Sequence, residues 1–570
     1  MKKFYYSIIT LISSIVIFYA CQDPLENIFI PISPELSSYE VSIQVYDLEN
    51  PSNLSDPEAL TVELLGPDAD KILNNSGRSE FIAQNGIINL AVNKKYSDIT
   101  EPIRFTVKIS GEDYLTTTIP VEVTGEEKFL EINANIVNLS SPPTGVDIER
   151  EFFTINSDGS TGEEIVVSTA NADTQRNLEV STEVVIPAGV QFFNASGELI
   201  SGRELEVQVI NFDNNETESL EAFPGGFSPN SIIDENGLEV TDATFITAGF
   251  TSIDMFLSGE EVKKFSKPIN IVMNINKGTF NPETRENLKV GDIIPIWSYS
   301  NDDGQWVYHG DGPVTLSNTG GFKVEYTTTH LSSYNLDFKS TGKCSSTRSV
   351  VRLEGVENLP DNVNYNMKLS FVQENSKQPV SSFATKGWSI NNKSKDLTLR
   401  NAPNVSMQML IYIQKPGKTS IPLPNLPEDD TQYSFESETA NVGEFVEVYR
   451  SEAFNGCDGE ISVPIYDIIQ SAGITPQINV TIEYVGRCGT REIAPSVGLY
   501  KKNASEIYEY AGYVNKGRIT LSLPKIDSTY YFGFYWGTEF YEDSLYVNST
   551  QMLDTDINLE EFCEKVLEDF

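Results

Sequence analysis

Residues 291–338 read GDIIPIWSYSNDDGQWVYHGDGPVTLSNTGGFKVEYTTTHLSSYNLDF, and this stretch decides what fold the chain is expected to adopt. It holds two of the four tryptophans and both histidines of the chain. The sequence NDDG at 301–304 separates two runs of β-forming residues, and Asp-Gly tolerates the positive φ that a tight hairpin turn requires. The stretch is therefore predicted to form three strands with two sharp turns, ending at the His-Leu-Ser sequence of residues 330–332.

The same pattern extends over most of the chain. Short strands separated by turn residues recur from about residue 39 onward, as in YEVSIQVYD and PIRFTVKIS. Regular short strands of this kind are typical of immunoglobulin-like β-sandwiches. At 570 residues the chain is expected to hold about four domains of ~100–200 residues each.

We therefore predict an all-β fold of tandem immunoglobulin-like β-sandwich domains. The predicted sandwiches span residues 36–140, 146–340, 341–449 and 450–570, with a linker, SSPPTG, after the first. The last domain is predicted to carry a short C-terminal helix. Asn558 and Glu561 have capping-box spacing there, and apolar residues follow at helical intervals.

The charge of the chain limits its partners. Lys and Arg total 40 and Asp and Glu total 82, which gives a formal net charge of −42. Such a surface repels nucleic acid and anionic lipid head groups. The charge indicates a soluble exterior or, alternatively, a cation-rich partner.

The common catalytic and metal-binding signatures are absent from the sequence. It contains no G-x-x-x-x-G-K-[ST], H-E-x-x-H or G-x-S-x-G, and its two histidines and scattered cysteines lack zinc-ligand spacing. Acidic loops at 213–216 and 301–304 offer oxygen ligands for Ca²⁺, but neither has the spacing of the twelve-residue calcium loop. We predict turns there, no metal site and no cofactor.

The N-terminus is predicted to be a targeting segment. Lys2 and Lys3 precede an apolar stretch at 4–20, which ends at Cys21, and no stop-transfer pattern follows. The sequence FYAC that ends at Cys21 resembles a bacterial lipoprotein signal. The resemblance implies a signal peptide at 1–20, a diacylglycerol and palmitate-type anchor on Cys21, and a tether at 21–35.

The residues after this cysteine suggest where the protein is exported. Gln22-Asp23 resembles the surface-export signal of Bacteroidota lipoproteins, and DST at 527–529 and DSL at 543–545 match the short O-glycosylation pattern of that phylum. The resemblance implies an outer-membrane lipoprotein exposed on the cell surface. Acyl chains would hold the acidic body at the membrane.

Four further cysteines lie in the second half of the chain. They are Cys344, Cys457, Cys488 and Cys563. An even number outside the cytoplasm predicts two disulfides, for which three connectivities remain open.

Short sequences in the second predicted domain recur in the order found in a known family. In chain order they are IPAG at 186–189, Gly197, GF at 249–250, PIW at 295–297, GQW at 304–306 and HLS at 330–332. They resemble the β-sandwich domain of netrin receptors, ankyrins and cartilage intermediate layer proteins. The resemblance implies one such sandwich over residues ~180–340.

The sequence around His330, Leu331 and Ser332 also resembles the His-Leu-Ser/Thr cleavage site of GAIN-type adhesion receptors. The resemblance implies cis-autoproteolysis. His330 would take the proton of the Ser332 hydroxyl, whose oxygen would attack the Leu331 carbonyl across a strained peptide. The paired cysteines and the tryptophan that precede the receptor site are missing. The alternative is structural, with His330 ending a strand and capping a turn.

A second candidate is the aromatic run YYFGFYW at 530–536. On a strand, Tyr531 and Tyr535 share one face, opposite the four aromatic residues of the core face. Tyrosine offers a flat apolar ring with a polar rim, so this face is predicted to be a platform on which sugar rings stack. Alternatively, both tyrosines pack beneath a loop or the terminal helix.

These features predict a lipid-anchored cell-envelope surface protein with a non-enzymatic binding or scaffold role, whose ligand is a glycan or an envelope protein. The alternative is a self-cleaving surface protein cut between Leu331 and Ser332. A glycan hydrolase would need a facing carboxylate pair, which the sequence does not identify.

Overall fold

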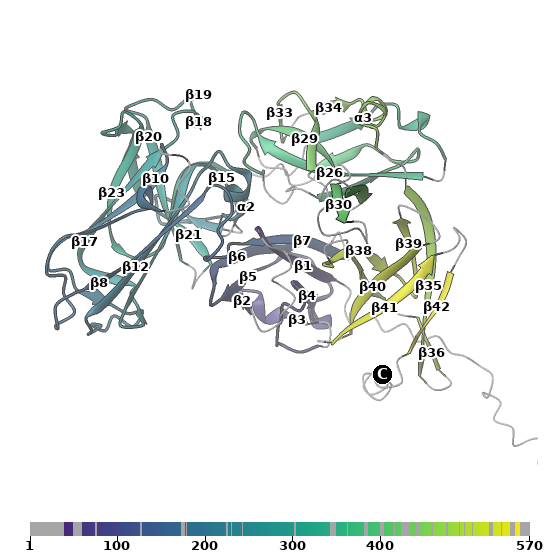
Figure 1. Ribbon diagram of the computed structural model, residues 1–570, viewed down its shortest axis with the longest axis horizontal. Helices are drawn as coiled ribbons and strands as arrows, with labels where there is room; N and C mark the ends of the chain where they lie inside the picture. The colour runs from purple at the N-terminus through teal and green to yellow at the C-terminus, as the bar shows by residue number, and fades with distance from the viewer. Residues whose placement is uncertain are drawn as a thin grey trace, which may run out of the picture.

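The computed structural model describes residues 39–49, 60–74, 77–125, 128–172, 177, 179–223, 226–227, 229, 231–241, 243–300, 304–341, 349–361, 363–380, 386–399, 404–414, 417–422, 434–439, 445–457, 460–474, 477–488, 491–494, 496–503, 506–523, 528–536, 539–547 and 553–558. The predicted signal peptide, Cys21, the tether and the C-terminal helix lie outside these residues. The described chain is all-β, as predicted, and its sheets form four sandwich-like units (Figure 1).

Two sheets pack face to face in the first unit. One has the order β3 (Ile72–Asn74), β4 (Ile87–Val92), β1 (Glu40–Asp47), β7 (Phe129–Ile136), and the other β2 (Thr61–Leu65), β5 (Ile103–Gly111), β6 (Tyr114–Val123). Short 3-10 turns at Ala69–Lys71 and Lys94–Tyr96 connect strands. Alternate apolar side chains, such as Ile43, Leu90 and Val107, are fully buried between the sheets.

The second unit is the largest sandwich. One sheet has the order β22 (Thr315–Leu316), β23 (Phe322–His330), β17 (Lys264–Ile275), β10 (Ser181–Ile186), β9 (Ile165–Ser168), with β11 (Phe192–Phe193) beside β17. The other has the order β14 (Glu239–Thr241), β13 (Ser231–Ile233), β21 (Gln305–Pro313), β20 (Ile293–Ser300), β24 (Ser333–Thr341), β15 (Ala243–Leu257), β12 (Glu204–Phe212), β8 (Val146–Thr154), with β16 (Glu260–Glu261) beside β15. Smaller elements are a 3-10 turn (Thr169–Asn171), α2 (Thr217–Glu221), β18 (Phe280–Asn281) and β19 (Glu286–Asn287).

The stretch at 291–338 joins these two sheets. β20 and β21 pair antiparallel, as the predicted hairpin requires. The chain then crosses to the other sheet as β22 and β23 and returns as β24. The stretch therefore supplies strands to both halves of the sandwich.

A β-bulge in β15 decides which side chains face outward from the larger sheet. The register of β15 against β24 shifts between Thr247 and Gly249, and Gly249 has a φ of +143°, which favours glycine. Phe245 and Phe250 lie five residues apart, so a regular strand would place them on opposite faces. Because the bulge inserts one residue, both rings lie on the outer face. There they form one aromatic cluster with side chains that include Trp297 and Trp306.

The third unit combines a large and a small sheet. The large sheet contains β27 (Lys386–Ile390), β26 (Val363–Gln373), β29 (Ser406–Gln414), β32 (Phe445–Arg450) and β33 (Phe454–Asn455), and the small one β28 (Leu397–Leu399), β25 (Ser349–Leu353) and β34 (Glu460–Val463). A separate hairpin pairs β30 (Gly417–Pro422) with β31 (Ser434–Thr439), and a 3-10 turn spans Val356–Asn358. α3 (Ile465–Ala472) follows β34.

One expected boundary in this region needs correction. The boundary after residue 449 is too early, because β33 pairs with β29 and β34 pairs with β25. The region also holds a helix that the sequence did not predict, which begins at Ile465. Ile465, Ile468 and Ile469 are buried at helical spacing, and Gly473 ends the helix in the left-handed conformation.

The fourth unit begins at β35 (Gln477–Cys488). It pairs with β36 (Arg491–Ile493), β39 (Arg518–Leu523) and β42 (Leu553–Asn558), and the facing sheet has the order β38 (Tyr508–Val514), β37 (Val497–Lys502), β40 (Ser528–Trp536), β41 (Glu539–Val547). Val480, Leu499 and Phe532 are among the side chains buried between them.

The four units contact one another in a closed ring (Figure 1). Leu115 and Val137 of the first unit pack into the aromatic cluster of the second. Gln378 of the third unit accepts a hydrogen bond from the Thr247 N–H of the second at 2.9 Å. Strand β26 of the third unit pairs with β35 of the fourth.

Tyrosines close the ring between the fourth and first units. The Tyr500 hydroxyl contacts the Ser42 hydroxyl and donates to Asn89 Oδ1 at 2.6 Å. Tyr510 stacks on Phe129 with ring centroids 4.4 Å apart. These contacts join chain segments that lie more than 350 residues apart in the sequence, so the ends of the described chain hold the ring together.

We expect Tyr500→Phe to loosen this closure. The ring would keep its packing, but Ser42 and Asn89 would each lose a buried partner, at a cost of about 1–3 kcal/mol in the free energy of unfolding. Hydrogen exchange should become faster in β1 and β4. Tyr546→Phe, at an exposed position of the same unit, is the matched control and should stay within about 0.5 kcal/mol of the parent. Equal exchange rates in both variants would contradict the assigned closure.

Candidate functional site

Residues 331 and 332 connect β23 to β24, where the chain crosses from one sheet of the second unit to the other. The Leu331 N–H donates to the Lys263 carbonyl at 2.9 Å. The Leu331 side chain packs against the main core, which is the hydrophobic cluster shared by the second and third units. Among the described residues no peptide bond is cis, and residues 330–333 have no positive φ. The connection is thus an ordinary, anchored crossover.

The His330 and Ser332 side chains have different partners. The Ser332 hydroxyl donates to the Tyr299 carbonyl. His330 Nδ1 lies 3.3 Å from the Thr328 hydroxyl, and the His330 carbonyl accepts from the Tyr334 hydroxyl at 2.6 Å. A general base must reach the proton that it removes. In this geometry the serine proton points to a carbonyl, which favours the structural alternative for this sequence.

The structure brings the two histidines of the chain together. His309 on β21 and His330 at the end of β23 have ring centroids 5.7 Å apart. Tyr334 lies beside both rings, at 5.5 Å from His309 and 6.0 Å from His330. Burial lowers the pKa of His330, and the neighbouring His309 and Lys264 lower it further. His330 therefore favours the neutral imidazole.

The aromatic run at 530–536 forms β40, and its two platform tyrosines have different environments. Tyr535 is only 4% exposed, and its hydroxyl donates to the Gln84 carbonyl of the first unit. The prediction of an open platform is wrong for Tyr535, because docking of the first unit covers that end of the sheet. Tyr531 is 47% exposed.

Tyr531 belongs to an open surface that we call the tyrosine face, made up of Lys502, Tyr531, Glu542 and Tyr546. Tyr546 is 54% exposed, and the register of β40 against β41 makes it a diagonal neighbour of Tyr531 on the same face. Lys502 Nζ lies 5.9 Å from the centre of the Tyr531 ring and 3.6 Å from the Glu542 carboxylate. The face combines two flat rings with polar groups beside them.

Sequence reasoning missed three of these four residues. Tyr546 alternates correctly within its strand, but only the pairing register shows that it lies beside Tyr531. Lys502 comes from β37, which the pairing with β40 brings next to the run. Residues on separate strands share a face only once that register is known.

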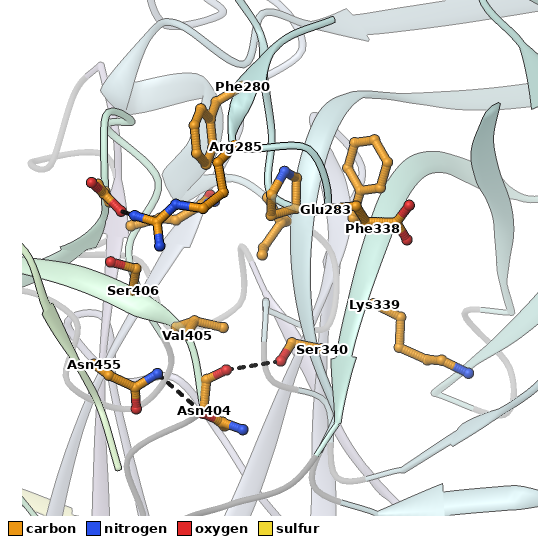
Figure 2. Close-up of a pocket in the computed structure, with 14 residues that line it drawn as sticks. Phe280, Glu283, Arg285, Phe338, Lys339, Ser340, Asn404, Val405, Ser406 and Asn455 are labelled. Atoms are coloured by element: carbon orange, nitrogen blue, oxygen red, sulfur yellow. Dashed lines mark hydrogen bonds and ion pairs between the residues drawn. The ribbon is translucent and has the colours of Figure 1, made fainter. Parts of the chain in front are cut away.

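A cavity of about 310 Å³ lies between the second and third units (Figure 2). Arg285 and Glu374 form an ion pair across it at 3.0 Å, and Ser340 donates to the Asn404 carbonyl at 3.1 Å. Phe280 and Phe338 add apolar surface to the lining. The polar contacts across the cavity link the two units.

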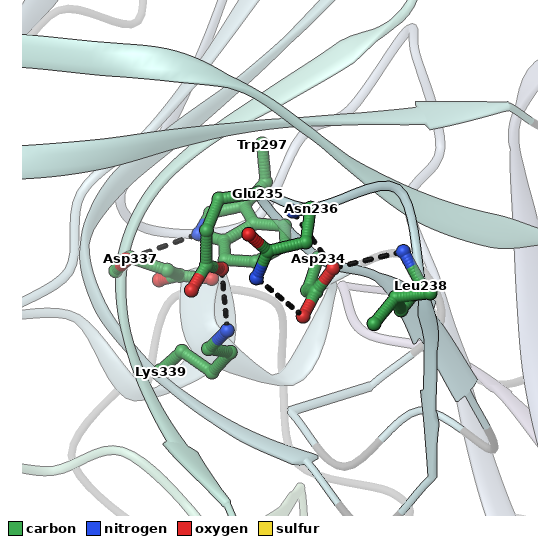
Figure 3. Close-up of polar contacts among 7 residues, drawn as sticks. All are labelled: Asp234, Glu235, Asn236, Leu238, Trp297, Asp337 and Lys339. Carbon is green, nitrogen blue, oxygen red and sulfur yellow. Dashed lines mark hydrogen bonds and ion pairs between the residues drawn. The ribbon is translucent and has the colours of Figure 1, made fainter.

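Asp337 carries a buried carboxyl group near this interface (Figure 3). The residue is 0% exposed, and neither carboxyl oxygen has a hydrogen-bond partner among the described residues. Burial raises the pKa of Asp337 well above its usual range. Its backbone carbonyl accepts from the Trp297 indole at 3.1 Å, while Lys339 pairs with Glu235 at 2.7 Å. The buried carboxyl therefore lies beside the ion pair of Lys339 and Glu235 without taking part in it (Figure 3).

The structure describes only some of the remaining site residues that the sequence predicted. Cys457 is partly buried against the main core, whereas the side chains of Cys344, Cys488 and Cys563 lie outside the described residues. The acidic loop at 213–216 is a turn before α2, in which the Asn215 N–H donates to the Asp213 carboxylate at 2.9 Å. In the described part of the chain, no three His, Cys, Asp or Glu side chains are grouped to hold a metal ion.

No protein-family model matches this chain, and no curated protein is similar to it in sequence. Solved structures match it only distantly. A minor pilin of Streptococcus agalactiae is 11% identical over 37% of this chain and 95% of its own, with a TM-score of 0.11. The Bacillus anthracis TIE protein is 10% identical over 72% of this chain and 74% of its own, with a TM-score of 0.12.

The full-length major pilin SpaD of Corynebacterium diphtheriae is 6% identical over 91% of this chain and 97% of its own, with a TM-score of 0.12. At such TM-scores these likenesses carry no argument about function. Among the described helices, none has the length and apolar character needed to cross a membrane.

We expect the purified full-length protein to remain uncut at the Leu331–Ser332 bond, because the Ser332 hydroxyl bonds to a carbonyl. Intact mass under denaturing conditions measures this, and two fragments meeting at Ser332 would contradict it. Ser332→Ala should lower the free energy of unfolding by about 1 kcal/mol through the lost hydrogen bond. Ser317→Ala, in an exposed turn, is the matched control and should change it by less than about 0.5 kcal/mol.

Proposed function

We propose that this protein is a lipid-anchored, non-enzymatic protein of the cell envelope that binds glycans through the tyrosine face of its fourth unit. The observation that carries the proposal is the exposure of both Tyr531 and Tyr546 on the same face of the β40–β41 pair. Large exposed aromatic side chains are costly to leave in water and are typical of binding surfaces.

The chemistry of the face suits a sugar ring. A pyranose presents C–H groups on its faces and hydroxyls around its edge, so it can stack on tyrosine while its edge meets polar groups. Lys502 can donate to such a hydroxyl and Glu542 can accept from one, and the two already lie 3.6 Å apart. Diagonal residues on adjacent strands lie ~7–8 Å apart, a spacing that lets one short glycan contact both rings.

The rest of the chain fits a display role. The signal-like N-terminus, with Cys21 as the acylated residue, would tether the ring of sandwiches to the outer membrane, where the strongly acidic body stays in solvent. Disulfides among Cys344, Cys457, Cys488 and Cys563 belong to the same extracytoplasmic setting, and their connectivity stays open. An envelope protein is the other ligand class that such a face could bind.

We expect Tyr531→Ala to weaken glycan binding about tenfold and the double variant with Tyr546→Ala to abolish it, since each ring supplies one stacking surface. Affinity electrophoresis in gels containing soluble polysaccharides, followed by titration with oligosaccharides, measures the effect. Tyr96→Ala, which removes an exposed tyrosine of the first unit, is the matched control. Glycan binding that survives the double variant would contradict the proposal, and binding of an envelope protein instead would reassign the ligand class.

We expect Cys21→Ala to release the protein from the membrane, because the diacylglycerol of such an anchor is attached through the thiol of this cysteine. Incorporation of labelled palmitate and partition into detergent measure the anchor. Cys457→Ala is the control and should keep both, although it removes another cysteine. If the Cys21 variant incorporates as much labelled palmitate as the parent protein, the proposed anchor on Cys21 is wrong. That result would not bear on glycan binding by the tyrosine face.

A further inference from the structure

The histidine pair of the second unit is the clearest feature that the proposed function leaves unused. The chain has two histidines among 570 residues, and the fold brings their rings to within 5.7 Å of each other. They come from different sheets. His309 falls within β21, which belongs to the nine-stranded sheet, whereas His330 ends β23 in the six-stranded one.

The local backbone explains how the rings meet. The register of β21 against β20 shifts between Ile296 and Trp297, so that Tyr308 and Gly310 have partners and His309 is the extra residue. A bulge of this kind redirects a side chain and is common at functional edges of sheets. Here it lets His309 reach the backbone of β23, where its Nε2 lies 3.1 Å from the Thr327 carbonyl.

The hydrogen bonds assign a free nitrogen to each ring. A carbonyl only accepts, so Nε2 of His309 carries the proton and its Nδ1 keeps a lone pair. Tyr334 donates to the His330 carbonyl, so the single proton of the Thr328 hydroxyl serves either that carbonyl or the Tyr334 oxygen. We therefore assign the tautomer in which Nδ1 of His330 donates to Thr328 and Nε2 keeps the lone pair. In these tautomers each ring presents one nitrogen that makes no hydrogen bond within the described part of the chain.

The separation of the rings suits a shared ion. Metal–nitrogen bonds to histidine are ~2.0–2.1 Å long, and each ring nitrogen lies about 1 Å from its ring centre, so two imidazoles on one ion have centres about 5–6 Å apart. The observed 5.7 Å falls in this range, with the rings tilted by 57°. Neither ring is fully buried, which leaves room for water to complete the coordination.

Some charges around the histidine pair oppose the binding of a cation, and others favour it. Lys264 faces His330 across the β17–β23 pair, and its positive charge opposes a cation there. Tyr326 and Tyr334 lie against the rings as neutral phenols, because burial raises the pKa of each. The net charge of −42 raises the local concentration of cations around the whole molecule.

We propose that His309 and His330 form a surface site for a late first-row divalent transition-metal ion, with one imidazole nitrogen from each and water as the remaining ligands. Imidazole suits copper, nickel and zinc, and affinity should fall from Cu²⁺ to Ni²⁺ and Zn²⁺. The site lies on the second unit and is independent of the tyrosine face on the fourth.

The test uses the full-length protein without a histidine tag, with isotope-labelled histidine and Zn²⁺ as the probe. Only two histidines contribute ring signals, so NMR reads the site without any substitution. We expect both sets of signals to move with one midpoint and calorimetry to give one ion per chain. Cu²⁺ should then show an electron paramagnetic resonance spectrum with two coordinated imidazole nitrogens.

Substitutions give the matching controls. His309→Gln and His330→Gln should each weaken Zn²⁺ binding at least tenfold, with thermal unfolding followed to confirm that the variants fold. Lys264→Gln removes the opposing charge and should tighten binding severalfold. Movement of only one histidine signal, or a stoichiometry that both histidine variants leave unchanged, would overturn the site.

Discussion

The burial of both faces of the nine-stranded sheet in the second unit is the constraint on which the rest of the structure depends. Its inner face packs against the six-stranded sheet through side chains such as Val207, Met255 and Leu336. Its outer face carries Trp297 and Trp306, each no more than 1% exposed. A sheet cannot cover its own aromatic outer face, so α2 of the same unit and side chains of the first unit pack onto it.

The aromatic cluster sets the geometry of that packing. Phe212 and Phe250 stack at 4.1 Å, and Phe223, which follows α2, stacks on Trp306 at 5.3 Å. Such ring pairs add roughly 0.5–1.5 kcal/mol beyond the burial of their area. The bulge at Gly249 is required for this arrangement, since it brings Phe250 to the outer face. Gln378 of the third unit then satisfies the Thr247 N–H beside the bulge, so the same irregularity positions two neighbours.

Closure of the ring divides the surface of the fourth unit. Tyr531 and Tyr535 point from the same face of one strand, yet the first unit covers Tyr535 and leaves Tyr531 in solvent. The boundary between interface and open surface therefore falls within β40. The histidine pair arises in a similar way, where a bulged strand of one sheet meets the end of a strand from the other. Both candidate sites lie at junctions between sheets or units.

The sequence was enough to predict the all-β class, the hairpin of β20 and β21 and the alternation that puts Phe532 in the core, because turn residues and a two-residue period are local properties. The other features depend on tertiary contacts. The helix at Ile465 was missed because a short apolar run fits a strand or a helix equally well. Register, bulges and docking bury Tyr535, give Ser332 its hydrogen-bond partner and bring His309 beside His330. These features join residues that are far apart in the chain, so they leave no local pattern in the sequence.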